Sequence, residues 1–381
     1  MNTLSQRIAI IWLTIAMMFV GCGGPKPQAA DDASKPITDV PPVKSITVLT
    51  WTENIPQDVL DAFTAETGTS VQLTTVTTNA QMHFLLERKP IQADVIIVND
   101  SFVENLISDG ELLPLPRSNL PNLTNIDSRW LDLEFDRGNQ YSVPYIVGLA
   151  GILYDKTLVP GGVAGFATTF NTRFQNRIAI MIDARDLFSC VLLTLGIPVT
   201  DVTPASIQTA MPVFRRWMQI AGDGAIINGE STDSQIARAL YGGEDSVAVL
   251  WNGTAAELVA KEPGRFAWVI PSEGTFMYID SCVIPKTTPA PGTALNFINF
   301  LLRADISAKI TGGYMPFLNP NKAGRALLTP EQLANPASYP TDAQLNSARF
   351  YRADKRMPIG QLYRALDLEP QPGAVNATPG R

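Results

Sequence analysis

The sequence predicts an α/β protein with two lobes, the first of which contains a parallel sheet. The chain has 381 residues, which is more than one ordinary domain usually holds. Between residues 45 and 110, short apolar runs that are typical of buried strands alternate with amphipathic patterns that are typical of helices. A β-α-β-α-β order of this kind favours a parallel sheet covered by helices.

The elements of the first lobe follow in order from residue 45. Ile46 and Val48 indicate a short buried strand, and the next helix has Pro56 at its first position and ends at Gly68. Residues 94–98 are apolar after Asp94, as in a central parallel strand. The remaining elements expected here are a strand at 70–76, helices at 79–86 and 101–106, and a Pro- and Leu-rich coil at 112–125.

The second lobe repeats the alternation of strands and helices. Leu187, Val191 and Leu195 recur at helical spacing, so a helix is expected from Asp183 onward. Residues 246–251, SVAVLW, predict a buried strand that a helix follows. The remaining elements expected are extended segments at 141–145 and 148–154, strands at 177–182, 266–270 and 275–284, helices at 204–221 and 293–303, a loop at 312–314 and a disordered tail at 369–381.

The N-terminus has the pattern of a targeting segment. Arg7 precedes an apolar run from Ile8 to Val20, which is short for a membrane span but typical of a secretory signal. Phe19-Val20-Gly21-Cys22 resembles a bacterial lipobox, although Phe19 and Val20 are bulkier than usual. We therefore expect a signal peptide at 1–21, a lipid on Cys22 and a Pro-rich disordered tether over 22–44, with simple secretion as the alternative.

Composition and motifs exclude several classes of function. The net charge of −7 argues against a nucleic-acid partner. The single histidine, His83, falls in a helical pattern and is expected to be structural, which largely excludes Ser-His-Asp and His-rich metal chemistry. The common phosphate-loop, hydrolase, zinc and calcium motifs are absent from the sequence, so no cofactor, metal site or catalytic residue is expected. Cys190 and Cys282 lie in apolar runs and are expected to be buried free thiols, although export would permit a disulfide.

Acidic and aromatic residues recur where predicted strands end. Trp51-Thr52-Glu53 lies between a strand and a helix, and local pattern alone favours a structural loop there. Asp183-Ala184-Arg185-Asp186 opens a helix and resembles a capping box. Trp251-Asn252-Gly253 ends another strand. Asp280 is the hardest to explain structurally, because a carboxylate inside an apolar strand needs an internal arginine or a ligand.

Together these residues predict a cleft that binds an elongated polycation. Each ammonium group gains charge-assisted hydrogen bonds from a carboxylate. Aromatic faces cover methylene groups and attract cations, with a contribution of about 0.5–2 kcal/mol each. The acids expected to take part are Glu53, Asp183, Asp186 and Asp280.

From Ser45 to about Leu366, the sequence resembles the bacterial spermidine/putrescine-binding proteins of ABC importers. The resemblance rests on the order of several short segments, namely Trp51-Thr52-Glu53, 63–68 (FTAETG), 141–146 (YSVPYI), Asp183-Ala184-Arg185, Trp251-Asn252-Gly253, Asp280-Ser281, 298–303 (INFLLR) and Gly313-Tyr314. It implies a two-lobe periplasmic binding protein, type II-like, whose discontinuous lobes are joined by crossing strands. The implied lobes are 45–150 plus 279–325, and 151–278 plus 326–368.

The resemblance also implies a set of ligand-binding residues. Tyr278 stands where tryptophan is common in the family, Asn99 and Ser101 stand where serine and tyrosine occur, and Tyr351 falls where a glutamine is found. Asp186 stands where the spermidine-type proteins have a glutamate. The complete implied set is Trp51, Thr52, Glu53, Asn99, Ser101, Asp183, Asp186, Trp251, Tyr278, Asp280, Tyr314 and Tyr351.

The expected function is capture of a polyamine by lobe closure and its delivery to the permease subunits of an ABC importer. Spermidine is the first expected ligand and putrescine the second. The protein is expected to be a periplasmic monomer that meets the membrane through its lipid anchor only. Alternatives are a sensor subunit without a transport role, a binding protein for quaternary ammoniums or cationic amino acids, and an envelope glycosidase built on a pair of carboxylates.

Overall fold

The computed structural model describes residue 37 and residues 43–180, 184–222 and 233–350. The predicted signal peptide, the lipid site at Cys22, most of the tether, Asp183, Tyr351 and the predicted disordered tail lie outside these described residues.

The described chain alternates strands and helices along most of its length. The elements from the start to the long fourth strand are β1 (Ser45–Trp51), α1 (Gln57–Thr67), β2 (Ser70–Val76), α2 (Asn79–Glu87), β3 (Val95–Asn99), α3 (Asp100–Ser108), η1 (Arg117–Asn119), η2 (Pro121–Asn125), η3 (Ser128–Trp130) and β4 (Ser142–Asp155). The elements that follow are α4 (Phe166–Thr169), η4 (Thr172–Phe174), β5 (Ile178–Ile180), α5 (Ala184–Thr194), α6 (Pro204–Ala221), α7 (Asp233–Gly242), β6 (Val247–Trp251), α8 (Asn252–Lys261), β7 (Phe266–Val269), β8 (Thr275–Val283), α9 (Pro291–Leu301), α10 (Ala304–Lys309), η6 (Ile310–Tyr314), α11 (Lys322–Arg325), α12 (Pro330–Leu333), α13 (Asp342–Ser347) and β9 (Ala348–Phe350).

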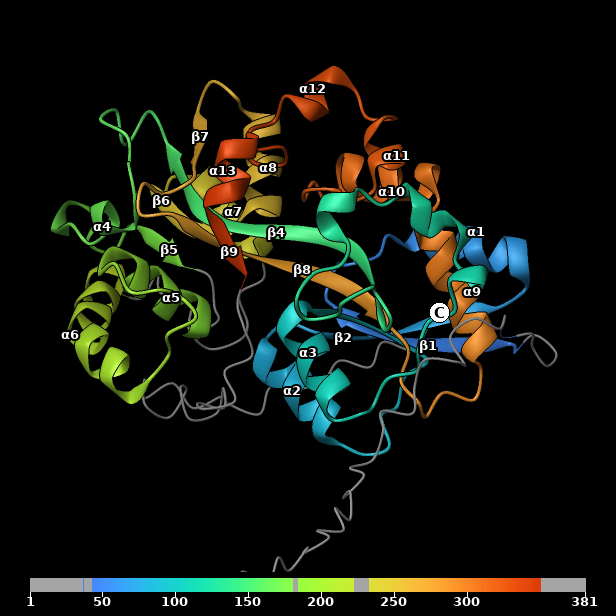
Figure 1. Cartoon of the computed structure of the whole chain (residues 1–381). Coiled ribbons are helices and arrows are strands. Elements are labelled where there is room, and N and C mark those ends of the chain that lie inside the picture. Colours follow the sequence, from blue (N-terminus) through green and yellow to red (C-terminus); the bar gives the residue numbers. More distant parts are fainter. Residues whose placement is uncertain (1–36, 38–42, 181–183, 223–232, 351–381) are drawn as a thin grey trace, which may run out of the picture.

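The strands form a continuous sheet in the order β2-β1-β3-β8-β4-β6-β5, with β7 paired to β4 and β9 to β8. β1 pairs in parallel with β2 and β3, which confirms the parallel sheet predicted for the first lobe. β4 and β8 are long antiparallel partners that pass from one group of elements to the other (Figure 1). Two lobes joined by crossing strands are therefore present, and the predicted fold class is confirmed.

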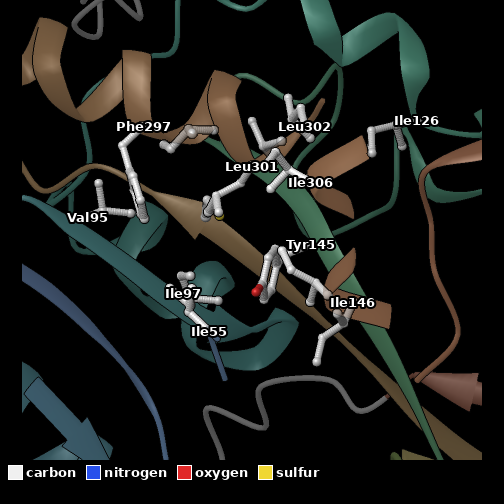
Figure 2. Packing of buried hydrophobic residues seen from close by; sticks show 14 of the residues in the cluster. Ile55, Val95, Ile97, Ile126, Tyr145, Ile146, Phe297, Leu301, Leu302 and Ile306 are labelled. Carbon is white, nitrogen blue, oxygen red and sulfur yellow. The ribbon is translucent and has the colours of Figure 1, made fainter. Parts of the chain in front are cut away.

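Each lobe buries helices against both faces of its part of the sheet. In the first lobe α1 and α9 pack on one face, and α2 and α3 pack on the other. Figure 2 shows Ile97, Tyr145 and Phe297 among the residues that meet in the core under α9. In the second lobe α5 and α6 cover one face, and α7 and α8 cover the other. The two cores hold the strand ends of each lobe in fixed positions, which is what a binding site between lobes requires.

Two local predictions were wrong, and a third was right but incomplete. The two extended segments predicted around Gly148 are confirmed as extended, and they join into one strand, β4, because Gly148 and Gly151 leave room for the rings of Tyr278 and Trp268, and a bulge between Pro144 and Ile146 accommodates the proline. The predicted coil at 112–125 contains short 3₁₀ helices, which apolar periodicity does not reveal.

The predicted loop at 312–314 is part of η6, a π-helical turn that continues α10. Here the amide of Met315 donates to the carbonyl of Ile310 at 2.9 Å. Tertiary packing against Leu328 around Gly312 outweighs the low helix propensity of the two glycines. The helix α7 had no counterpart among the sequence predictions.

Cys190 and Cys282 are both buried and free, as predicted. Among the described residues, none of the helices has the length and apolar content needed to cross a bilayer.

Candidate ligand cleft

The loop after β1 is held in place by its buried residues and presents Glu53 outward. The side chain of Asn54 donates to Thr50 Oγ1 at 2.7 Å, and the hydroxyl of Tyr145 donates to the carbonyl of Asn54 at 2.7 Å. Glu53 adopts a left-handed conformation with φ of 58°, which costs a non-glycine residue about 1–2 kcal/mol. Its side chain is exposed and has no hydrogen-bond partner among the described residues. A strained residue whose carboxylate is free to bind is typical of a functional loop.

Asp280 lies in β8 and contacts Trp51 across the sheet. Trp51 Nε1 donates to Asp280 Oδ1 at 3.2 Å, although the two residues are 229 positions apart. Only 1% of Asp280 is exposed. Within the described residues no arginine or lysine forms an ion pair with it, so the internal arginine considered from the sequence is not its partner. Burial raises the pKa of Asp280 to about 8, the charge of Asp100 adds to this rise, and the Trp51 hydrogen bond opposes it.

Three aromatic rings from different elements form a group beside β8. Trp251 and Tyr278 meet edge to face with ring centroids 4.6 Å apart, and Tyr278 lies 6.5 Å from the ring of Phe317. Two glycines make the packing possible, since a Cβ at Gly148 would lie 2.2 Å from the Tyr278 ring and one at Gly253 would lie 2.3 Å from Phe317. Phe317 was not predicted from the sequence as a member of this aromatic group. Its packing on Gly253, which only the structure reveals, identifies it as one.

Asn99 and Ser101 are brought next to Asp280 by strand register. Asn99 pairs directly opposite Asp280 in the antiparallel β3–β8 ladder. Its side-chain oxygen caps α3 by accepting from the amide of Phe102, and it also accepts from Ser101 Oγ at 2.7 Å. Its amide nitrogen donates to Asn79 Oδ1 at 3.2 Å. These polar groups therefore form a preorganised network at the end of β3.

Thr52 and Tyr314 lie beside the Glu53 loop. The backbone amide and the hydroxyl of Thr52 both donate to the carbonyl of Val76, at 2.9 and 3.3 Å, which ties the loop to β2. The hydroxyl oxygen of Thr52 retains a lone pair for a donor on a ligand. Tyr314 is 48% exposed. Burial raises the pKa of Tyr314, and the negative charge of Glu53 adds to this, so the two side chains interact.

The second-lobe acids are only partly described. Asp186 lies in the first turn of α5 and is 4% exposed. Its negative charge contributes to the raised pKa of the buried Cys190 thiol, after burial itself. Asp183 and Tyr351 lie outside the described residues, so the structure does not place them relative to Asp280.

Asp100 is a further acid that sequence analysis missed. It is the first residue of α3, it is 2% exposed, and it accepts from the amide of Ile279 at 3.2 Å. Burial raises the pKa of Asp100 to about 7. Asp100 was missed because an acid at the start of a helix is ordinarily explained by its favourable interaction with the helix dipole. Its proximity to β8 depends on a long-range strand pairing that the sequence does not show.

Fold and site together define the class. Two α/β lobes share long crossing strands, and polar and aromatic residues gather where strands end, which is the arrangement of a two-lobe solute-binding protein. Residues 58–341 match the family of bacterial extracellular solute-binding proteins, and the chain belongs to this family.

Named relatives agree with the resemblance seen in the sequence, which is confirmed. The chain is 31% identical over 309 residues to the spermidine/putrescine-binding periplasmic protein of Salmonella typhimurium, with 80% of this chain and 85% of the relative covered. It is 27% identical over 342 residues to a putrescine/cadaverine-binding protein of Pseudomonas aeruginosa, covering 84% and 92%. A solved structure described as a putative spermidine/putrescine ABC transporter from Listeria monocytogenes superposes with a TM-score of 0.77 at 29% identity, covering 86% and 98%.

Proposed function

We propose that this protein captures a polyamine outside the cytoplasm and delivers it to the permease of an ABC importer. Spermidine is the first proposed ligand and putrescine the second. The observation that carries the proposal is Asp280, a buried carboxylate that has an indole donor but no cationic partner among the described residues. Relatives named for spermidine and putrescine binding support the same ligand class.

An ammonium group supplies what Asp280 lacks. A buried carboxylate without a cation is costly, and N–H donors from an ammonium restore both charge balance and hydrogen bonds. In this proposal Trp51, Trp251, Tyr278 and Tyr314 pack the methylene groups, and Glu53 holds a second ammonium at the mouth of the cleft. The further proposed contacts are hydrogen bonds from Thr52, Asn99, Ser101 and Tyr351, and acids Asp183 and Asp186 from the second lobe.

Closure of the two lobes is the proposed mechanism of capture. The proposed lobes are residues 45–150 plus 279–325, and residues 151–278 plus 326–368. Support for the return of the chain to the second lobe comes from Asn335, which donates to the carbonyl of Ala256 at 2.8 Å, and from Asn252, which donates to the carbonyl of Ala337 at 3.1 Å. A small rotation at the crossing strands would bring the two sets of acids onto opposite sides of the ligand.

Anchoring through Cys22 completes the proposal. The signal peptide and lipobox pattern support a mature protein that lies in the periplasm and is held to a bacterial membrane by its lipid. In this proposal the protein works as a monomer without a cofactor and without catalytic activity. Intact-mass analysis of the mature protein tests the anchor. A lipid adduct on an N-terminal Cys22 supports it, and an unmodified mature chain overturns it.

Calorimetric titration of the purified protein tests the ligand. Spermidine, putrescine, spermine, glycine betaine and arginine are compared at one pH. Saturable one-to-one binding of spermidine or putrescine supports the proposal. Binding of glycine betaine or arginine with no response to the polyamines overturns it in favour of another cation.

A further inference from the structure

Asp100 and Asp280 come from distant parts of the chain and are brought near each other where β3 pairs with β8. Asn99, the last residue of β3, pairs opposite Asp280 in the ladder with β8, and Asp100 is the next residue. The amide of Ile279, which precedes Asp280, donates to Asp100 Oδ1 at 3.2 Å. The two carboxyl groups are 2% and 1% exposed. Both carboxyl groups are therefore shielded from water near the junction of α3 and β8.

Neither carboxyl group is neutralised by an ion pair with another described residue. Asp100 accepts one hydrogen bond from the amide of Ile279, and Asp280 accepts one from Trp51. Two neighbouring buried carboxylates are costly to ionise together, so one of them holds a proton more strongly than an isolated acid. Burial raises the pKa of both groups, to about 7 for Asp100 and about 8 for Asp280, and the charge of Asp100 contributes at Asp280.

The charged and titratable groups around the pair come from four elements. Glu104 on α3 raises the pKa of Asp100, and Arg185 on α5 lowers it. Burial raises the pKa values of Tyr145 on β4 and Cys282 on β8, and the charge of Asp280 adds to both rises, so both groups stay neutral at physiological pH.

We propose that Asp100 is a positioning residue of the cleft, which acts through Asp280 so that binding of the ligand's ammonium group releases a proton held by the two acids. The proposal rests on the proposed polyamine function. In the empty protein one O–H bond is present on the pair. When the ammonium approaches, this bond breaks, the proton passes to solvent buffer, and the carboxylate of Asp280 accepts an N–H from the ligand, whose own N–H bonds all remain. One positive charge enters the buried site as one leaves.

The consequence is an affinity that depends on pH. Where binding releases one proton, affinity rises by up to about tenfold for each unit of pH. Asp100→Asn removes the neighbouring acid, so Asp280 ionises at lower pH and the rise in affinity moves to lower pH with it. A purely structural role for Asp100 would weaken binding equally at every pH.

Calorimetric titration of spermidine into the whole mature protein tests this, at pH 6, 7 and 8 in phosphate and in Tris, whose ionisation enthalpies differ. The wild type is expected to gain several-fold in affinity per pH unit and to release about one proton at pH 7. Asp100→Asn is expected to release measurably less and to lose less affinity at pH 6, because burial still raises the pKa of Asp280 but the neighbouring charge no longer adds to the rise. The control is Asp109→Asn, an exposed acid at the other end of α3, which should match the wild type. Equal proton release in wild type and Asp100→Asn overturns the proposal.

A second measurement separates this proposal from the proposed function and needs no variant. Carboxyl-carbon NMR of the ligand-free wild type, with the aspartate signals assigned, is expected to show Asp100 and Asp280 titrating well above pH 5, beside Asp245, whose pKa burial raises to about 6. Titration of Asp100 and Asp280 near pH 4 overturns the proton-sharing pair whatever the ligand is. Conversely, a wild type that shows the raised titrations but binds no polyamine overturns the function and leaves the pair in place.

Discussion

The indole Nε1 of Trp51 donates a hydrogen bond to the carboxylate of Asp280 at 3.2 Å, which joins the end of β1 to the interior of β8. The contact fixes an aromatic face and a buried acid next to each other before any ligand binds. Trp51 also lies 6.5 Å from the ring of Phe102, which supports the indole from the side of α3. The first-lobe half of the proposed cleft would therefore be preorganised, and preorganisation lowers the cost of binding.

Asp280→Asn should weaken spermidine binding by roughly tenfold to a hundredfold, because hydrogen bonds to charged groups contribute about 1.5–3 kcal/mol. The amide keeps the shape of the side chain and removes its charge. Calorimetry at pH 8 gives the change in Kd. Asp342→Asn, an exposed acid on α13 that pairs with Arg129, is the control and should bind as the wild type does. An unchanged Kd for Asp280→Asn would remove Asp280 from the site.

Trp51→Phe should weaken binding by several-fold, since it keeps an aromatic face but loses the N–H donor to Asp280. Loss of that donor should also raise the pKa of Asp280 further, because the hydrogen bond favours the ionised form. The loss of affinity should therefore be larger at pH 7 than at pH 9. Titrations at the two values check this, and a loss of the same size at both contradicts the proposed role of the indole.

Stability of the empty protein should respond to pH through the same acids. Asp280 and Asp100 have folded-state pKa values of about 8 and about 7, above their ordinary value of 3.8. The folded state then binds more protons than the unfolded state between these values, so their contribution is favourable at low pH and is lost as pH rises from about 4 to about 8. Asp280→Asn should become more stable relative to the wild type as pH rises, by at most about 1.4 kcal/mol per unit. Urea unfolding at pH 5, 7 and 9 measures the difference, and a difference that is independent of pH contradicts the raised pKa.

Gly148→Ala should disturb the aromatic group. Its Cβ would lie 2.2 Å from the ring of Tyr278, so the ring must move or the strand must shift. Overpacking of this kind typically costs about 1–3 kcal/mol. Gly161→Ala is the matched control because nothing lies within 4 Å of the added carbon. The urea midpoint and the spermidine Kd should both change for Gly148→Ala and for neither in the control. If Gly148→Ala had the same urea midpoint and the same spermidine Kd as Gly161→Ala, the ring of Tyr278 would not be tightly packed on Gly148.

Local sequence predicted most elements and several site residues for clear physical reasons. Periodicity located β2 and α6 at their observed bounds, since α6 buries one face and the side chains of β2 alternate at its start between exposed and half-buried. Asp280 could be identified because a carboxylate in an apolar strand has few structural explanations.

Other features depend on contacts that the sequence does not display. Asp100 gains its significance from Ile279, 179 positions away, through the β3–β8 ladder. Phe317 gains its significance from its packing on Gly253, which comes from a different element of the chain. The continuity of β4 was hidden because its glycines disfavour a strand locally, and only the rings packed on them explain their presence. The site residues that depend on long-range strand pairing therefore could not be predicted from the sequence.

The most direct measurement is a crystal structure of the mature protein in complex with spermidine. The proposed function predicts one spermidine between the lobes, with an amine nitrogen within about 2.7–3.2 Å of the carboxylate of Asp280. The methylene chain should lie against Trp51 and the Trp251–Tyr278 group. A spermidine bound elsewhere on the protein, with Asp280 still contacting only the Trp51 indole, would contradict the central claim.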